Sequence, residues 1–172
     1  MKKIEKFLLL SLLPLLFITC EKTDDGSYVA PLTVYEKLAG TWYLGGLKLV
    51  DEIAKANSIT PDEVELKSEF SFNTFNITFN VDADSLPTTF EVNGSAPELF
   101  LGEGYWELDS PFPHTDGTSV EIYLYTDEAR TQLADKLSIT ALPGARPELE
   151  FTLTRMSAGA PYASYVYKLV QH

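Results

Sequence analysis

Residues 75–81 are Phe-Asn-Ile-Thr-Phe-Asn-Val, an unbroken alternation of apolar and polar side chains. Because successive side chains of a β-strand point to opposite faces of the sheet, this stretch predicts a strand with one face in the core. The same alternation returns in three later stretches, at 120–124, 149–153 and 165–169. Together they predict an all-β domain built from half-buried strands.

Other runs rich in aromatic and β-branched residues, separated by turn residues such as Asn93-Gly94, extend this pattern along the chain. Eight strands are predicted, at 41–51, 70–82, 88–93, 104–109, 119–126, 136–142, 148–156 and 164–171. Most connections are short and none has the pattern of a crossover helix, so we expect an antiparallel, up-and-down, eight-stranded barrel. A β-sandwich is the alternative. Gly45-Gly46 interrupts the first strand and predicts a one-residue bulge that bends it.

Two short helices are expected beside the strands. Residues 33–39 are long enough for one helical turn. Thr60-Pro61-Asp62-Glu63 combines an N-cap Thr, Pro at the first helical position and a Glu placed for a capping box. It predicts a helix at 61–67, between the first two strands, where it would cover the open end of the barrel.

The N-terminus carries three lysines followed by an apolar run at 7–18. The run is shorter than the roughly 20 residues of a membrane-spanning helix and is typical of a signal peptide. It ends in Phe17-Ile18-Thr19-Cys20, with the only cysteine of the chain. This segment resembles the lipobox of bacterial lipoproteins, which implies a signal peptide at 1–19 and a lipidated Cys20 that anchors the protein in a membrane. An exported protein with an incidental cysteine is the alternative.

A polar stretch follows the cysteine, and we expect a flexible tether at 20–33 and the barrel domain at 34–172. Acidic residues at 21–25 are similar to the export signal that sends some Bacteroidetes lipoproteins to the outer face of the outer membrane. A solvated linker explains them equally well. We therefore expect a lipid-anchored location in the cell envelope, at the outer membrane, on its periplasmic face or at the cell surface.

Gly40-Thr41-Trp42 opens the first predicted strand and matches the Gly-x-Trp of lipocalins. With the signal peptide and the lipobox, the whole chain resembles the uncharacterised lipocalin-like lipoproteins of Bacteroidetes. This resemblance implies a barrel that binds one small apolar or amphipathic ligand.

The charge and composition of the chain argue against nucleic acid as a partner and against a His/Cys metal site. The chain has 13 Lys and Arg against 25 Asp and Glu, a net charge of -12, whereas a nucleic-acid-binding surface needs a basic face. One cysteine and two histidines cannot form a His/Cys metal cage. We expect neither a metal nor a cofactor.

The longer loops of an up-and-down barrel with these strands gather at the end opposite Trp42, which predicts that this end is the mouth. Trp42 is then a structural plug of the closed end. Five residues are candidates for ligand contacts: inward-facing Trp106, Leu124 and Arg155, and Phe100 and Tyr162 on flanking loops. An inward Arg155 in an apolar barrel needs an anion, an aromatic face or solvent at the mouth.

Catalysis is not expected, because His114 has no Ser or Cys nucleophile motif around it and the paired carboxylates are common in so acidic a chain. Two hypotheses remain. A ligand carrier needs an open, apolar lumen. An interaction or glycan-binding subunit would instead have a filled core and an exposed surface, for which the outward stripe of Glu121, Tyr123 and Tyr125 is a candidate.

Overall fold

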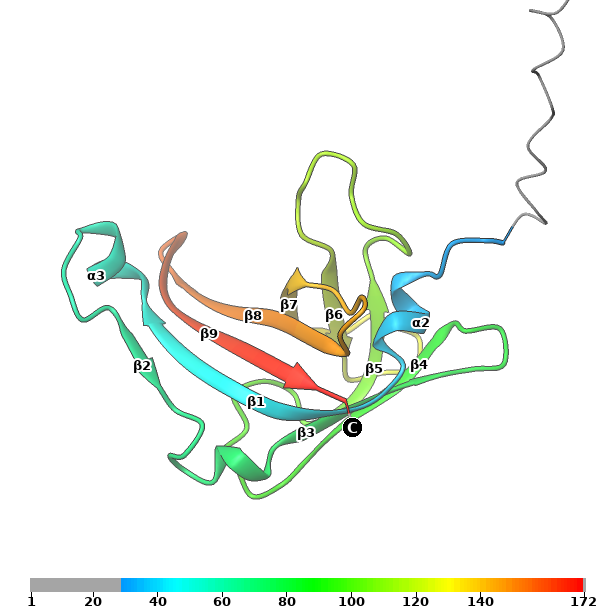
Figure 1. Ribbon diagram of the computed structural model, residues 1–172, viewed down its shortest axis with the longest axis horizontal. Helices are drawn as coiled ribbons and strands as arrows, with labels where there is room; N and C mark the ends of the chain where they lie inside the picture. The colour runs from blue at the N-terminus through cyan, green and yellow to red at the C-terminus, as the bar shows by residue number, and fades with distance from the viewer. Residues whose placement is uncertain (1–28, 172) are drawn as a thin grey trace, which may run out of the picture. The chain divides into compact units, whose positions relative to one another are not determined.

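Eight antiparallel strands close into a barrel in the computed structural model (Figure 1), which describes residues 29–171. Each strand pairs with the next in the chain, and β1 pairs with β9 to close the barrel. The strands are β1 (Gly40–Asp51), β3 (Asn76–Val81), β4 (Pro87–Asn93), β5 (Glu103–Leu108), β6 (Glu121–Tyr125), β7 (Leu133–Ala141), β8 (Glu148–Ser157) and β9 (Ala160–Val170). This confirms the all-β, up-and-down, lipocalin-like barrel, and the β-sandwich is discarded. Cys20 and the expected signal peptide lie outside the described residues.

The bulge in β1 lies where the sequence places it. The pairing of β1 with β9 shifts register between Leu44 and Gly46. Trp42, Leu44 and Leu47 are all buried, although a regular strand would turn Leu47 to the opposite face. The extra residue therefore keeps the apolar side chains of β1 on the inside as the strand bends.

The helix α2 (Val34–Leu38) confirms the expected turn before β1. Its N-cap residue Thr33 accepts a hydrogen bond from the backbone N–H of Glu36, and the Glu36 carboxylate accepts one from the N–H of Thr33. This capping box satisfies backbone donors that the first helical turn leaves free. The backbone N–H and the hydroxyl of Thr33 both donate to the Glu36 carboxylate, and these two hydrogen bonds hold the pKa of Glu36 below its usual value.

A short helix between the first two strands of the barrel is confirmed, but its predicted position at 61–67 is wrong. Residues Glu63–Glu65 form a short strand, β2, against the outer part of β1, and the helix α3 (Glu52–Ala56) forms earlier, capped by the Asp51 carboxylate. β1 continues beyond its pairing with β3, which ends at Tyr43, so its edge is free to pair with β2. These long-range hydrogen bonds outweigh the local capping signal. No residue of α3 is buried, so this helix does not cover the mouth either.

Other boundaries also differ from the prediction. The strand expected at 70–82 begins only at Asn76, after the 3-10 turn η2 (Phe72–Thr74). The loop expected at 157–163 is a two-residue turn, Ala158-Gly159, with φ angles of 48° and 80°. Positive φ at both positions is the geometry of a tight hairpin, which extends β8 and β9.

Among residues 29–171, no helix is long and apolar enough to cross a membrane.

Candidate functional site

The interior of the barrel is a packed core. Every strand of the barrel contributes at least one buried apolar side chain. The aromatic rings contact one another, with ring centroids 5.0 Å apart for Phe79 and Trp106 and 4.9 Å apart for Phe151 and Tyr167. The largest fully buried side chains are Trp42, Trp106, Tyr167, Phe79, Phe90 and Phe151. A ligand therefore finds this space already occupied by side chains.

The end of the barrel at Trp42 is closed by neighbouring segments of chain. The Trp42 indole N–H donates to the carbonyl of Leu38, at 2.7 Å, at the end of α2. At the start of α2, the Val34 N–H donates to the carbonyl of Pro111 in the loop after β5, at 2.8 Å. These contacts fit the expected role of Trp42 as a plug.

Trp106 and Leu124 lie side by side on β5 and β6 and are both completely buried. The Trp106 indole N–H donates to the carbonyl of Asn80 at 2.9 Å, and its ring packs edge-on against Tyr35 of α2, 5.7 Å away. Because both side chains are completely buried, neither lines an open mouth, although Leu124 lies opposite Asp135 at the mouth end of β6. A contact between either residue and a ligand stays a prediction.

The mouth is closed by Phe100, which belongs to the loop between β4 and β5 rather than to a strand. Its side chain is 7% exposed and makes edge-on contacts with Phe75, Phe151 and Tyr167 at 5.7–6.2 Å. One side chain from a connecting loop thus completes the core at this end.

Arg155 and Asp135 hold this loop in place. The Arg155 guanidinium donates to the carbonyl of Leu99, and the Asp135 carboxylate accepts from the N–H of Leu101 at 2.9 Å. The two side chains also form an ion pair across the mouth, with Nη1 and Oδ1 3.3 Å apart. Of the three partners expected for an inward Arg155, an anion, an aromatic face or solvent, the structure supplies an anion.

The predicted strand at 136–142 begins one residue too late to include Asp135. Asp135 precedes Leu137 and Ile139, the buried residues of β7, by two and four positions. Extending the alternation by one step would have placed an inward carboxylate at the mouth, opposite the inward arginine.

Tyr167 lies beneath Phe100 and is completely buried. Its hydroxyl is the one buried side-chain polar atom of the described residues without a hydrogen-bond partner. Burial raises the pKa of this hydroxyl far above its usual value, with a smaller contribution from Tyr165. An unpaired hydroxyl in the core is destabilising and marks a position where a polar group of a ligand or a water molecule could bind.

Tyr162, the remaining candidate, lies on β9 close to the tight turn and is 43% exposed. It is outside the core that contains Phe100, Trp106 and Leu124. The structure therefore does not bring the five candidates together.

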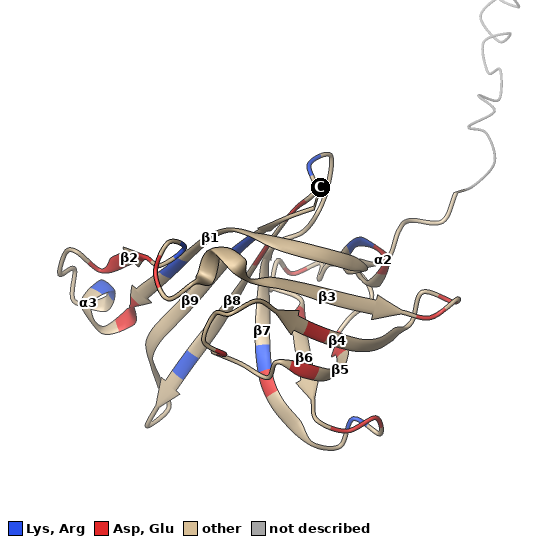
Figure 2. Cartoon of the chain, turned by 90° about the horizontal axis from the view of Figure 1, so that it is seen from below, with Lys and Arg blue, Asp and Glu red and all other residues tan. Residues whose placement is uncertain are grey.

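A groove opens between β7 and β8 at the mouth. In Figure 2 these two strands diverge toward the lower edge of the view. The groove has a volume of about 500 Å³. Its lining residues are Leu133, Ala134, Asp135, Lys136, Ser138, Leu153, Thr154, Arg155 and Met156. This cavity is open to the outside of the barrel, unlike the filled interior.

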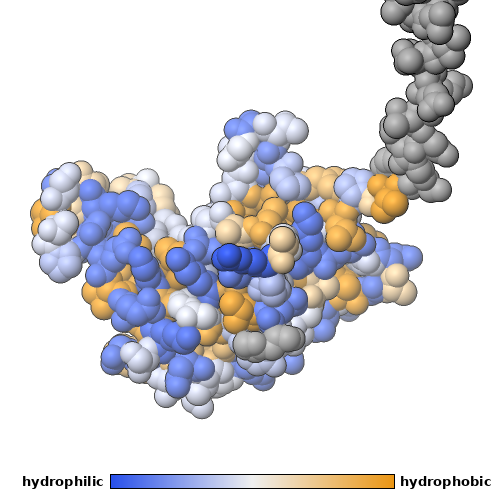
Figure 3. All heavy atoms as spheres, in the orientation of Figure 1, coloured by the Kyte–Doolittle hydropathy of each residue, from blue (hydrophilic) through white to orange (hydrophobic). Residues whose placement is uncertain are grey.

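The outer face of β5 and β6 carries tyrosines. Tyr105 lies directly opposite Tyr125, and Glu107 directly opposite Tyr123, so the four side chains share one face of the sheet. Partial burial raises the pKa of Tyr125, and the negative charge of Glu107 adds to this shift. Over the face of the molecule shown in Figure 3, hydrophobic residues are interspersed with hydrophilic ones.

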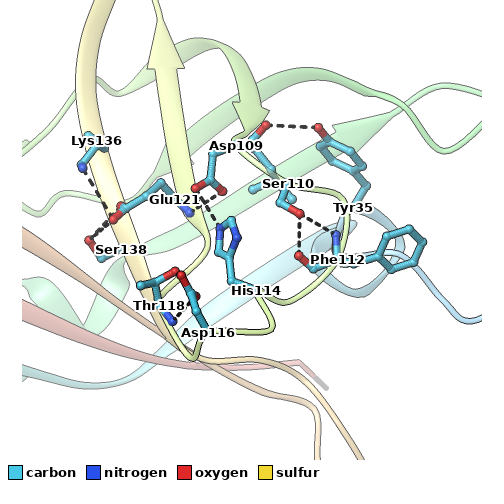
Figure 4. Close-up of polar contacts among 11 residues, drawn as sticks. Tyr35, Asp109, Ser110, Phe112, His114, Asp116, Thr118, Glu121, Lys136 and Ser138 are labelled. Atoms are coloured by element: carbon cyan, nitrogen blue, oxygen red, sulfur yellow. Dashed lines mark hydrogen bonds and ion pairs between the residues drawn. The ribbon is translucent and has the colours of Figure 1, made fainter.

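His114 lies in the loop between β5 and β6 and points toward Asp109 (Figure 4), with Nε2 3.1 Å from Oδ2. The other oxygen of Asp109 accepts from the backbone N–H of Glu121 at 2.9 Å. The nearby Ser110 hydroxyl is hydrogen-bonded to the backbone of Phe112, not to the histidine. This arrangement ties a loop to the sheet and offers no activated nucleophile. Within residues 29–171, no cluster of His, Cys, Asp and Glu could hold a metal ion.

Comparison with protein families gives one assignment. Residues 18–170 match the family described as Domain of unknown function (DUF5004), and the chain belongs to this family. Searches of the curated proteins and of the solved structures found no match.

Proposed function

We propose that this member of the DUF5004 family is a lipid-anchored, non-catalytic interaction module of the cell envelope, which binds a partner with the outside of its barrel. The observation that carries the proposal is the contrast between the filled interior and the open groove between β7 and β8. Binding sites are concave surfaces that a partner can reach, and the groove is one.

The anchor is the second part of the proposal. The apolar run at 7–18 followed by Cys20 resembles the processing site of bacterial lipoproteins. Several acyl chains on one cysteine give stable membrane attachment. The barrel would then act at the envelope surface, at the outer membrane.

A small apolar or amphipathic ligand bound inside the barrel is the second candidate function. The unpaired hydroxyl of Tyr167 favours it, because a polar group of such a ligand could pair with it. This ligand would have to displace Phe100, so the loop between β4 and β5 would have to move.

The test uses the full chain in its own envelope, with a photo-crosslinking amino acid at Leu133 in the groove or, as a control, at Ala83 in the turn between β3 and β4. We expect covalent adducts with a polypeptide from Leu133 only. Native mass spectrometry of the purified protein is expected to show the lipid on Cys20 and no further small molecule. A small molecule present at one copy per chain, without polypeptide adducts, would establish the second candidate instead.

A further inference from the structure

We propose that the groove between β7 and β8 binds an extended segment of a partner polypeptide, which adds to the barrel as a strand between them. This inference rests on the proposed interaction function and specifies its surface and its kind of partner. Strand addition to a free sheet edge is a common mode of peptide recognition.

The pairing between β7 and β8 stops halfway along both strands. It includes Ala141 with Glu150, Ile139 with Phe151 and Ser138 with Thr152, and then ends. β7 nevertheless continues to Leu133 and β8 to Ser157, each still paired on its other side, with β6 and β9 respectively. Each strand therefore has one edge that faces the groove without a strand partner in the described part of the chain. The backbone donors and acceptors of such an edge are those that another extended chain satisfies.

Side chains connect the two walls of the groove. If the pairing of Ser138 with Thr152 continued regularly, Asp135 would lie opposite Arg155. The backbones have separated at this level, but the two side chains still meet at 3.3 Å and both also hold the loop at 99–101. The groove is thus preorganised, which lowers the entropy cost of binding.

The size of the groove fits a short peptide segment. The lining residues 133–136 on β7 and 153–156 on β8 each span about 13 Å at the rise of roughly 3.3 Å per strand residue. A segment of about four extended residues matches this length, and the volume of about 500 Å³ lies within the usual range of binding sites.

The side chains of the groove indicate what the segment carries. Leu133 and Met156 are more than half exposed, at 55% and 56%, although they are large and apolar. The two cations of the groove, Lys136 and Arg155, each form an ion pair with a carboxylate, with Glu121 at 3.5 Å and with Asp135 at 3.3 Å. We therefore expect a segment with an apolar residue that covers Leu133 and Met156.

The experiment uses a displayed library of random dodecapeptides, selected on the full lipidated chain in detergent micelles. Two variants, Ala134→Trp and Thr154→Trp, fill the groove from its two walls, and Thr140→Trp is the matched control on the exposed face of the paired half of β7. We expect the selected apolar peptides to bind the natural protein and the control equally. Binding to the two groove variants should be at least tenfold weaker.

N-methylation of the peptide tests the backbone directly, because a methyl group removes a donor without changing a side chain. Methylation of alternate amides should weaken binding more than tenfold, and hydrogen exchange at 133–137 and 153–157 should slow in the complex. Selected peptides that tolerate every N-methyl group, or that bind the groove variants as tightly as the control, would overturn the inference. So would a groove that pairs with a second copy of this chain, which sedimentation would detect as a dimer lost in Thr154→Trp.

The two proposals fail in different ways. Polypeptide adducts from Leu133 in the envelope, combined with peptides insensitive to N-methylation, would leave the interaction function in place and remove strand addition. Absence of any polypeptide adduct from Leu133 would remove both.

Discussion

The two ends of the barrel are closed by different means. At the closed end, the indole N–H groups of Trp42 and Trp106 both donate to backbone carbonyls, and Trp42 bonds to a residue four positions earlier in the chain. At the mouth, Phe100, Asp135 and Arg155 come from three separate segments, the Tyr167 hydroxyl is unpaired, and the pairing of β7 with β8 is incomplete. The indole N–H groups at the closed end are thus hydrogen-bonded, whereas the mouth keeps unpaired polar groups. A partner gains hydrogen bonds where such groups are unpaired.

The largest effect is expected from Trp42→Ala at the closed end. Removing a fully buried tryptophan leaves a cavity and frees the carbonyl of Leu38, so we expect a loss of about 4 kcal/mol in the free energy of unfolding. Urea unfolding measures this, with Tyr162→Ala, an exposed change at the mouth, as a control expected to cost about 0.5 kcal/mol. Equal losses in the two variants would contradict the distinction between the ends.

Phe100→Ala tests the mouth in the same way. We expect a smaller loss, about 2–3 kcal/mol, because a connecting loop can collapse into the space better than a strand can. The measurement is again urea unfolding, together with the binding of a fluorescent fatty-acid analogue. Gain of binding only in the variant would show that the interior can hold a ligand once Phe100 is gone, which would support the second candidate function.

Asp135→Ala separates the polar contacts of the mouth from its packing. It leaves the guanidinium of Arg155 and the N–H of Leu101 without this acceptor, so we expect a loss of about 2 kcal/mol. Asp135→Asn keeps a carbonyl acceptor and should lose about half as much. Hydrogen exchange at residues 99–101 should quicken in Asp135→Ala; unchanged exchange there would refute the role of this pair in holding the loop.

Tyr167→Phe is expected to have the smallest effect, with the opposite sign. Removing a buried hydroxyl that has no partner relieves its desolvation cost, so the variant should be more stable by about 1 kcal/mol. Tyr165→Phe, on the same strand but only partly buried, is the control. A loss of stability in Tyr167→Phe would mean that a water molecule or a ligand satisfies the hydroxyl in solution.

The stability of the natural protein and that of Tyr167→Phe should depend differently on pH. Burial raises the pKa of Tyr167 in the folded state, while an unfolded tyrosine ionises near pH 10. The native state therefore binds the proton more tightly, and the stability from this group is complete below about pH 10 and lost as the pH rises further. Above this pH the natural protein should lose up to about 1.4 kcal/mol per pH unit more than Tyr167→Phe. Parallel curves for the two proteins would contradict the burial of this hydroxyl.

Sequence reasoning recovered the barrel because its signals are local and repeated. The period-two alternation of residues 75–81 and of three later strands identifies the buried face of each strand, and Gly45-Gly46 marks the bulge. The failed helix at 61–67 had equally good local signals. It failed because the free edge of β1 offered residues 63–65 a pairing that sequence alone cannot reveal.

The candidate site was recovered only in part. That an inward Arg155 needs an anion, an aromatic face or solvent follows from electrostatics, but the presence of an anion, Asp135, depends on how β7 and β8 face each other. The burial of Trp106 was missed because parity places a side chain inside a barrel without saying how deep it lies.

The sequence by itself determined the strands, their inward faces, the bulge and the need of Arg155 for an anion, an aromatic face or solvent, because each depends on neighbours a few residues apart. The tertiary structure alone decided that Phe100 fills the mouth and that Tyr167 is left unpaired. It also decided that the pairing of β7 with β8 stops at Ser138 and Thr152. These features arise from contacts between segments far apart in the chain, whose packing depends on the three-dimensional fit of the whole barrel.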